Sequence, residues 1–578
     1  MIKRLRLTAM AAAVSTLLLG AVSVVQAQQL PQTWQEQQDF RSGPTPFAEL
    51  MQFWYELDAG SELVSMRPLT RTLLEREMAV ITIANEPITN PQDALRSGKT
   101  IVLLAPSVHG GEVSPKEAVQ LVAKELVAGD LRSVLDDVIV LLLPLVNPDG
   151  GEVRRRTNES GFDMNRDYIK LESQEIQALV TQVLNEWTPD IHVDGHHGGS
   201  VPYVVTYQST MNPAADAELM AYPHENIFPL IREAVRAQDY ASFDYSGTRT
   251  ENGVMGWGAT SVEPRKHHVY TGLTNSIGIL LETPRNTRRV MRDGTVAEIP
   301  EEEQYFHQIR GQVLAMSAIL RAAADQKDAI RAVTTGSRMR AIRAGSTGGD
   351  PVVLDYALTN RGNEPVWMPD EEAPLGYTLR DVPVYLKYDI TRTTPRPVGY
   401  LLPPSMAAVV PRLLDHDIAV YRFLEPTSMD AEVYYASKVR RDSYFQGHYL
   451  KSVEVEKTEE RLDVVPGWFW IPTAQSRANL ISYLMEPETD DNLITWGWVD
   501  HVLQVRPETV EEALAEMTEG IDLSALSAEQ RTRMEERAAR MVADPQQVPM
   551  MRVMSHQALP VIQVEPFNGY QRNRYVRD

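Results

Sequence analysis

Two histidine-bearing motifs carry the side chains of this sequence that are best suited to hold a metal ion. The first is His109-Gly110-Gly111-Glu112, and the second is residues 192–197, which contain three histidines. An H-x-x-E pair and one distant imidazole make a His₂Glu set, the three-ligand arrangement of a catalytic zinc whose fourth position stays open to water. The pattern therefore predicts a metallohydrolase, with one zinc ion as its cofactor.

The third ligand can come from more than one position in the second motif. His192 lies inside a short predicted strand, whereas His196 and His197 follow at its exit, beside glycines. A side chain at the end of a strand favours His196 as the ligand, with His197 as the alternative. The first motif also has a purely structural explanation, because a carboxylate such as Glu112 is stabilised at a helix N-terminus.

Glu282 is the candidate for proton transfer. It ends an apolar run at residues 278–281, directly before a Thr-Pro pair. An acidic side chain at the end of a buried strand is uncommon unless it is paired or functional. Beside a metal site it would act as the general base toward water and then as the acid that protonates a leaving amine. The alternative is a salt bridge to Arg285 or Arg288.

Residues 154–167 hold a further group of polar side chains. Asn165 and Arg166 stand side by side, and a guanidinium matches a carboxylate in a bidentate way, so the pair can receive a substrate carboxylate. Asp163 can accept the spare N–H of a metal-bound histidine, although it can also be an ordinary turn residue. Of the three consecutive arginines at 154–156, one near a metal can stabilise an oxyanion, whereas otherwise they form a solvated loop.

These residues are positioned by alternating strands and helices. Residues 100–105 and 138–146 are continuous apolar runs, typical of strands covered on both faces, and apolar residues at helical spacing lie between them at 114–128. The alternation continues with a helix at 172–186, strands at 191–193, 202–207 and 277–281, and a helix at 305–323. The sequence thus predicts one α/β domain over residues 46–332, with most of the polar motifs at or just beyond the ends of its strands.

The second half of the chain has a different pattern of predicted secondary structure. Residues 345–349 resemble a linker, and residues 352–357, 384–388 and 433–436 look like strands between Pro- and Gly-bearing turns. Residues 398–424 read as strand, helix and strand, 475–485 as a helix and 511–543 as a polar helical stretch. Residues 333–578 are therefore expected to form an accessory α+β region with β character, in one or two subdomains, with a structural or substrate-restricting role.

In this order on an alternating chain, the four motifs HGGE, RTNESGFDMNRDY, DGHHGG and GILLETP resemble the zinc carboxypeptidase (carboxypeptidase A-like) family. The resemblance covers about half of the chain, residues 46–332, and implies a three-layer domain with a mixed central sheet. It also implies that His109, Glu112 and His196 are the zinc ligands, and that Glu282 is the catalytic glutamate.

The same resemblance assigns the substrate-facing residues. Arg156 matches the arginine that polarises the scissile carbonyl, Asp163 matches the aspartate behind a zinc ligand, and Asn165 with Arg166 matches the pair that grips the C-terminal carboxylate. The family's substrate-binding loop tyrosine has no clear counterpart, and Tyr270 is the nearest candidate upstream of Glu282. The implied activity is hydrolysis of C-terminal peptide bonds. The alternatives are a zinc amidase for cell-wall peptides and a non-catalytic peptide- or glycan-binding homologue.

Composition and the N-terminal sequence limit the possible partners, metal ligands and location of the protein. The chain has 578 residues, a net charge of −22 and no cysteine. The acidity argues against nucleic acid and anionic membranes as partners, and a metal can be held only by histidine, carboxylate and water. Residues 1–27, with a cationic start, an apolar stretch and small residues before Gln28, predict a cleaved signal peptide, followed by a polar tail at residues 28–45. We therefore expect export to a bacterial periplasm or the outside, without stable membrane insertion after cleavage.

Overall fold

The computed structural model describes residues 30–258, 262–519, 521, 526–556 and 564–567, so the predicted signal peptide lies outside the described residues. The N-terminal half is built on an eight-stranded mixed sheet with the order β1-β2-β4-β3-β5-β10-β6-β7. Its strands are β1 (Val64–Arg71), β2 (Glu77–Ile83), β3 (Thr100–Pro106), β4 (Val138–Leu142), β5 (Ile191–His197), β6 (Val205–Ser209), β7 (Ser242–Asp244) and β10 (Ile277–Thr283). The predicted mixed α/β fold is confirmed.

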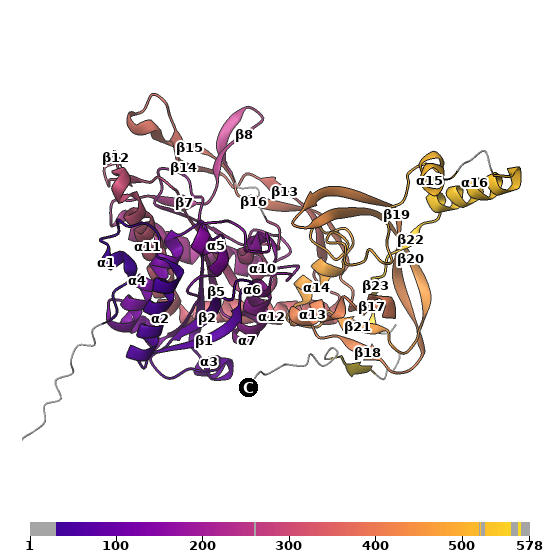
Figure 1. The fold of residues 1–578 in the computed structure, drawn as a ribbon, viewed down its shortest axis with the longest axis horizontal. Coiled ribbons are helices and arrows are strands. Elements are labelled where there is room, and N and C mark those ends of the chain that lie inside the picture. Colours follow the sequence, from indigo (N-terminus) through magenta and orange to yellow (C-terminus); the bar gives the residue numbers. More distant parts are fainter. Residues whose placement is uncertain (1–29, 259–261, 520, 522–525, 557–563, 568–578) are drawn as a thin grey trace, which may run out of the picture.

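The central strands of this sheet are covered on both faces. Every residue of β3, β4 and β10 is buried, as their continuous apolar runs predict. Helices α2 (Phe47–Gly60), α4 (Ser114–Ala128), α9 (Phe228–Arg236) and α11 (Gln304–Asp325) pack into one hydrophobic core with one face of the sheet. Helices α6 (Gln174–Leu179), α7 (Asn185–Trp187) and α10 (His267–Leu273) pack into the core on the other face, which gives three layers (Figure 1).

Several predicted elements have different bounds in the structure, and two of these differences have a clear physical reason. The apolar run at 138–146 forms β4 only up to Leu142, because Pro144 cannot donate to the ladder. The predicted linker at 345–349 is wrong for its first residues: helix α12 (Lys327–Thr347) continues through Gly345 and ends against Gly348, whose φ of 65° suits a glycine C-cap. The predicted division after residue 332 therefore falls inside a helix.

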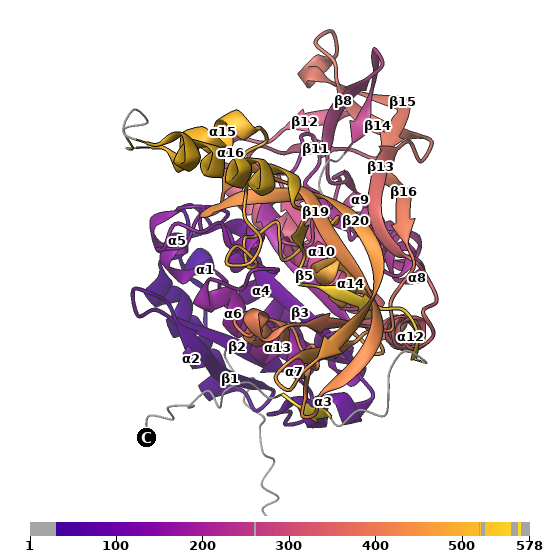
Figure 2. The same ribbon diagram turned by 90° about the vertical axis from the view of Figure 1, so that its right-hand side faces the viewer.

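The C-terminal half has the expected β character. Its main sheet runs β20-β19-β23-β17-β21-β18-β24, with β22 beside β19. The strands are β17 (Gly399–Leu402), β18 (Tyr421–Phe423), β19 (Thr427–Phe445), β20 (His448–Val464), β21 (Phe469–Pro472), β22 (Gln546–Gln547), β23 (Met551–Val553) and β24 (Val564–Pro566). Figure 2 looks onto β19 and β20, which form one long antiparallel hairpin.

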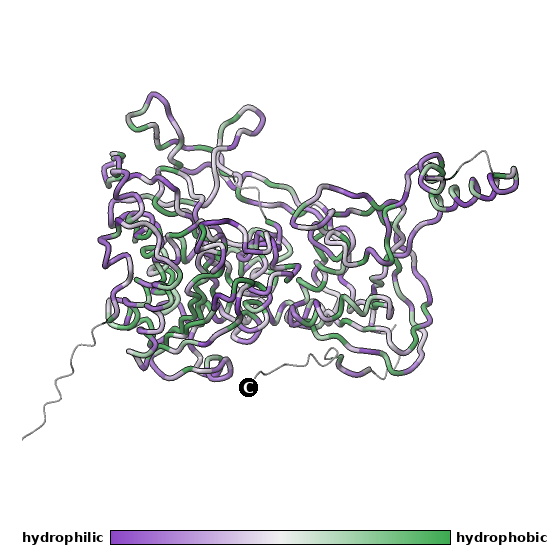
Figure 3. Tube along the Cα trace, in the orientation of Figure 1, coloured by the Kyte–Doolittle hydropathy of each residue, from purple (hydrophilic) through white to green (hydrophobic). Residues whose placement is uncertain are grey.

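Helices of the C-terminal half lie on both sides of this sheet. Helices α13 (Val410–Asp415) and α14 (Ala478–Met485) lie between the two halves, and α15 (Val510–Met517) and α16 (Ala528–Ala543) project as an arm (Figure 1). In Figure 3, which colours the chain by hydropathy, the most hydrophobic segments lie in the N-terminal sheet. Among the described residues, no helix is both long and apolar enough to cross a bilayer.

The two halves share a hydrophobic core and a small sheet. One hydrophobic core contains residues of both, including Tyr270 and Leu273 from α10 and Tyr400, Leu413 and Leu480 from the C-terminal half. A smaller sheet also mixes them, because β15 pairs in parallel with β9. That sheet has the order β14-β15-β9-β8 and consists of β8 (Gly247–Glu251), β9 (Val254–Gly258), β14 (Asn363–Pro369) and β15 (Tyr377–Tyr385).

Candidate metal centre and active site

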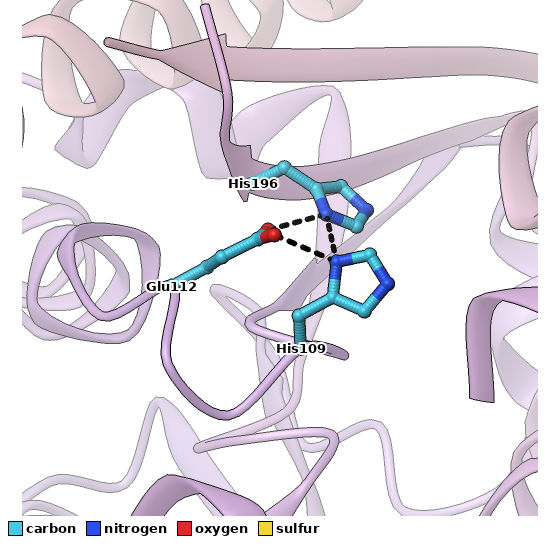
Figure 4. Close-up of side chains that lie close together, drawn as sticks. All are labelled: His109, Glu112 and His196. Atoms are coloured by element: carbon cyan, nitrogen blue, oxygen red, sulfur yellow. Dashed lines mark hydrogen bonds and ion pairs between the residues drawn. The ribbon is translucent and has the colours of Figure 1, made fainter. Parts of the chain in front are cut away.

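His109, Glu112 and His196 come together at one point, as the sequence predicts. One potential ligand atom from each lies within 4.8 Å of the others. Glu112 Oε1 is 2.8 Å from His109 Nδ1, and Glu112 Oε2 is 2.7 Å from His196 Nδ1. The two Nδ1 atoms are 3.1 Å apart (Figure 4). All three groups therefore present their donor atoms to the same small volume.

The elements around the cluster explain why these side chains converge. His109 and Glu112 belong to the loop after β3, where the backbone N–H of Glu112 donates to His109 O at 3.0 Å and closes a turn. The loop packs too closely for a side chain at Gly110, whose added Cβ would lie 2.1 Å from the carbonyl carbon of Gly150. His196 lies near the end of β5, the strand that pairs with β3. The ligands thus come from the carboxyl ends of adjacent parallel strands.

A second layer of polar groups holds His109. Asp163 Oδ1 lies 3.0 Å from His109 Nε2, the position that a carboxylate takes behind a metal-bound imidazole. Arg156 donates from Nε to Asp163 Oδ2 at 2.9 Å and from Nη1 to Glu112 Oε1 at 3.3 Å. Half of the Arg156 side chain stays exposed, so its guanidinium is accessible from solvent next to the cluster.

His196 is held by a different carboxylate. Its Nε2 lies 3.0 Å from Asp194 Oδ1 and 3.0 Å from Asn165 Nδ2. His197 points elsewhere, because its Nε2 contacts the hydroxyl and backbone N–H of Ser114, and only its backbone N–H reaches Glu112. The geometry therefore brings His196, and not the imidazole of His197, to the predicted ligand position.

Asp194 was not among the predicted site residues. The signal that could have identified it is its position two residues before His196, because alternate residues of a strand lie on the same face. Burial opposes ionisation of Asp194, but His196 and His267 outweigh it and hold the pKa of this carboxyl well below its usual range. Asp194 is thus placed to orient His196 as Asp163 orients His109.

Asn165 and Arg166 lie beside the cluster in different environments. The Asn165 amide is buried and engaged on both sides, since Nδ2 faces His196 and Oδ1 accepts from the backbone N–H of His267 at 2.9 Å. Arg166 is partly exposed and donates to Asn165 O at 2.7 Å. Burial is the largest cause that lowers the pKa of Arg166, and the nearby charges of Arg156 and Arg265 act in the same direction. The carboxylate-binding role stays a prediction for both, with Arg166 the more available group.

Glu282 stands next to His196. The two residues are partners in the parallel pairing of β10 with β5. Glu282 is only 7% exposed, and its Oε2 has no hydrogen-bond partner among the described residues. Burial raises the pKa of Glu282 to about 8, and the charges of Glu112 and Asp194 also raise it, against the effect of His196. A buried carboxyl with a free oxygen and a raised pKa is suited to proton transfer. The alternative salt bridges to Arg285 or Arg288 do not form in the described structure.

A tyrosine other than Tyr270 lies near this site. Tyr270 is fully buried in α10, where its hydroxyl contacts His416. Tyr245 follows β7 directly, and the charge of Glu282 is the largest cause that raises its pKa, followed by burial and by the charge of Glu112. Tyr245 therefore lies near the cluster. Nothing in the spacing of the sequence could have singled it out, because the turn after β7 places it.

The donor set fits a zinc ion. Two imidazoles and one carboxylate are zinc ligands, and the carboxylates of Asp163, Asp194 and Glu282 surround them at close range. Burial opposes ionisation of Glu112, but His196 and His109 outweigh it and lower the pKa of the carboxyl. A buried group of carboxylates around two imidazoles favours a divalent cation over an empty pocket.

Comparisons with known proteins agree with this geometry. Residues 50–221 match the family described as zinc carboxypeptidase; this segment contains His109, Glu112 and His196. Carboxypeptidase 2 of Trichophyton rubrum is 24% identical over 457 residues, which cover 72% of this chain and 76% of the relative. Carboxypeptidase 2 of Trichophyton equinum is 25% identical over 441 residues, which cover 69% and 74%.

Solved structures cover a smaller part of the chain. The metallo-carboxypeptidase from Burkholderia cenocepacia is 22% identical, with a TM-score of 0.36, over 48% of this chain and 67% of that one. The metallo-carboxypeptidase from Pseudomonas aeruginosa in complex with (2-guanidinoethylmercapto)succinic acid is 19% identical, with a TM-score of 0.36, over 49% and 68%.

Proposed function

This chain belongs to the zinc carboxypeptidase family through residues 50–221, and from that premise we propose that it removes C-terminal residues from peptides with Glu282 as the general base. The observation that carries the proposal is the pairing of Glu282 with His196 in adjacent parallel strands. It puts an unpartnered, buried carboxylate oxygen beside the predicted ligand cluster. A metal-binding protein without catalysis has no need for such a group, because burying it is unfavourable.

The ligands would be His109, Glu112 and His196. Zinc bound there supplies a Lewis acid that acidifies water and polarises a carbonyl. Glu282 accepts the proton of the attacking water, because its buried Oε2 has no other partner among the described residues and its strand position is next to that of His196. The same carboxyl then gives the proton to the leaving amine. Asp163 and Asp194 keep the two imidazoles oriented throughout.

Two arginines are placed to recognise the substrate. Arg156 lies within hydrogen-bond distance of Glu112 and has half of its side chain exposed, so its guanidinium can stabilise the oxyanion that develops on the scissile carbonyl. Arg166 lies on the same segment and is partly exposed, so it can hold the terminal carboxylate of a peptide. A free C-terminus is the substrate feature that such a pair recognises.

The test is release of C-terminal amino acids from a mixed peptide library, followed by mass spectrometry with and without a chelator. We expect stepwise trimming that a chelator abolishes and zinc restores. Absence of trimming by a protein with zinc demonstrably bound would contradict the proposal. Muropeptides in a parallel reaction would then separate a cell-wall amidase from a non-catalytic binding protein.

Export is part of the proposal and rests on the sequence of residues 1–27. Fractionation of expressing cells and N-terminal sequencing of the product test it. A mature protein that begins at Gln28 outside the cytoplasm is the expected result, and an intact Met1 in the cytoplasm would contradict it.

A further inference from the structure

The tip of the β19–β20 hairpin reaches the segment that carries Asp163, although nearly three hundred residues separate the two in sequence. Gln446, half-buried at the turn, accepts a hydrogen bond through Oε1 from the backbone N–H of Asp163 at 2.9 Å. The next residue, Gly447, packs on the neighbouring Phe162, whose ring would lie 3.6 Å from a Cβ added at Gly447. A turn of the C-terminal half therefore touches the polar layer behind the ligand cluster.

Asp163, the residue that Gln446 holds, makes several contacts behind His109. Asp163 Oδ1 lies 3.0 Å from His109 Nε2 and accepts from the backbone N–H of Asn165 at 3.0 Å. Asp163 Oδ2 accepts from Arg156. A shift of the Asp163 backbone would thus move its carboxylate. Because that carboxylate contacts both His109 and Arg156, the shift would disturb both side chains.

The conformation of the turn points to a specific use of the glutamine. Phe445 and His448 are paired across the hairpin, which leaves Gln446 and Gly447 as a two-residue loop. Their φ angles are 49° and 83°, so both lie in the left-handed region, as in a type I′ turn. Asparagine and glycine are preferred at the first of these positions. A glutamine there is conformationally unfavourable, and such residues persist where the surrounding structure uses them.

Contacts on either side of the turn hold it against the N-terminal half. His448 Nε2 lies 2.8 Å from Glu172 Oε1. The guanidinium of Arg265 lies over the Phe445 ring at 5.2 Å from its centroid. The Arg265 side chain also pairs with Asp491 of the C-terminal half. The turn is therefore fixed from both flanks, and the Gln446 amide has a defined position toward Asp163.

We propose that Gln446 is a positioning residue for the metal centre, so that the C-terminal half takes part in the active site through this one turn. Gln446 holds the Asp163 backbone, Asp163 orients the His109 imidazole, and His109 binds the metal. The inference rests on the proposed function only in that it requires zinc to bind at His109, Glu112 and His196.

Substitution of Gln446 by two residues separates this role from a structural one. Gln446→Asn introduces the residue that the turn prefers but shortens the side chain by one methylene, so the contact with Asp163 is lost. Gln446→Glu keeps the length and an acceptor oxygen. The measurements are zinc affinity by competition with a chromophoric chelator, melting temperature and kcat/KM, each beside the wild-type protein.

We expect Gln446→Asn to melt at or above the wild-type temperature but to bind zinc about tenfold more weakly, the lower end for loss of a group behind a ligand. Its kcat/KM should fall with the affinity at limiting zinc, whereas Gln446→Glu should stay within about threefold of wild type in affinity. Wild-type affinity in Gln446→Asn would overturn the inference, and so would equal losses in both variants. Failure of the wild-type protein to bind zinc would instead overturn the proposed function.

Discussion

The two large sheets of this molecule place their polar residues in different ways. In the N-terminal sheet the central strands are buried almost from end to end, and the predicted functional side chains lie where β3, β5 and β10 end. In the C-terminal sheet, β20 alternates between exposed and partly buried residues along most of its length. That sheet contacts the segment of Asp163 through the turn between β19 and β20. Under the proposed function, the first sheet would supply catalytic groups at strand ends, and the second would supply a positioning contact through a loop.

The difference extends to buried charge. The N-terminal sheet buries its carboxylates around the ligand cluster, where Glu282 Oε2 has no hydrogen bond within the described part of the chain. The C-terminal sheet buries Arg552 and Glu486 as a fully enclosed pair, and the hydroxyls of Tyr400 and Tyr434 donate to Glu486 at 2.7 and 2.6 Å. Both oxygens of Glu486 accept a hydrogen bond, which favours one packing of the second sheet, whereas a buried carboxylate oxygen without a described partner in the first sheet is typical of a reactive group.

The strongest test of this comparison is Glu282→Gln. Loss of the base should lower kcat/KM by about 10²- to 10⁴-fold, while zinc content and melting temperature stay at or above wild-type values, since a buried ionisable group is removed. Steady-state kinetics on a trimmed peptide, with metal analysis of the same sample, measure both. Full activity with zinc bound would remove Glu282 from the mechanism.

Alanine variants of the adjacent residues His196 and His197 test which histidine at the end of β5 is the third zinc ligand. His196→Ala removes a predicted ligand and should weaken zinc binding by more than about 100-fold, beyond the effect of losing a group behind a ligand. His197→Ala loses only contacts to Ser114 and should change zinc affinity by no more than about threefold. Chelator competition measures the two side by side. The reverse order of effects would assign the third ligand to His197.

Glu486→Gln tests the other sheet. It leaves the buried Arg552 with Glu432 as its remaining carboxylate, 3.0 Å away, so we expect unfolding to become easier by about 3 kcal/mol, the lower end for breaking a buried pair. Zinc affinity should not change, because the described contacts of the pair are to residues such as Glu432, Tyr400 and Tyr434 and not to the cluster residues. Denaturant unfolding and chelator competition check the two parts. A loss of zinc affinity without a loss of stability would show that the sheets do not divide these roles.

The smallest effect concerns acid stability at the contact between the halves. Burial opposes ionisation of Glu172, but His448 and Lys170 outweigh it and lower its pKa to about 2, below the ordinary 4.5. A carboxyl with a lowered pKa stabilises the folded state above pH 4.5, and this stabilisation disappears as the pH falls toward 2. Melting curves of wild type and Glu172→Gln should therefore differ at pH 6 and converge in acid. A difference that grows as the pH falls would contradict this sign.

Most of the N-terminal half could be predicted from the sequence, because its signals are local. The apolar runs of β3 and β10 and the helical spacing of α4 identify buried elements, and the polar residues that interrupt them are the ligand cluster and Glu282. Asp194 could also have been predicted, because it lies two residues before His196 in the same strand and therefore on the same face. Tyr245 and Gln446 had none, because a turn after an edge strand and a contact between distant segments depend on tertiary packing.

The shared core described above has a consequence for how the protein folds. Tyr270 and Leu273 of α10 pack in the same cluster as Leu413 and Leu480, and the boundary predicted after residue 332 cuts α12. A fragment that ends there would expose apolar surface that the intact chain buries and would lose most of a helix. Melting of the described chain is therefore expected to be a single cooperative transition, and the ligand cluster is stabilised by sequence synthesised long after it.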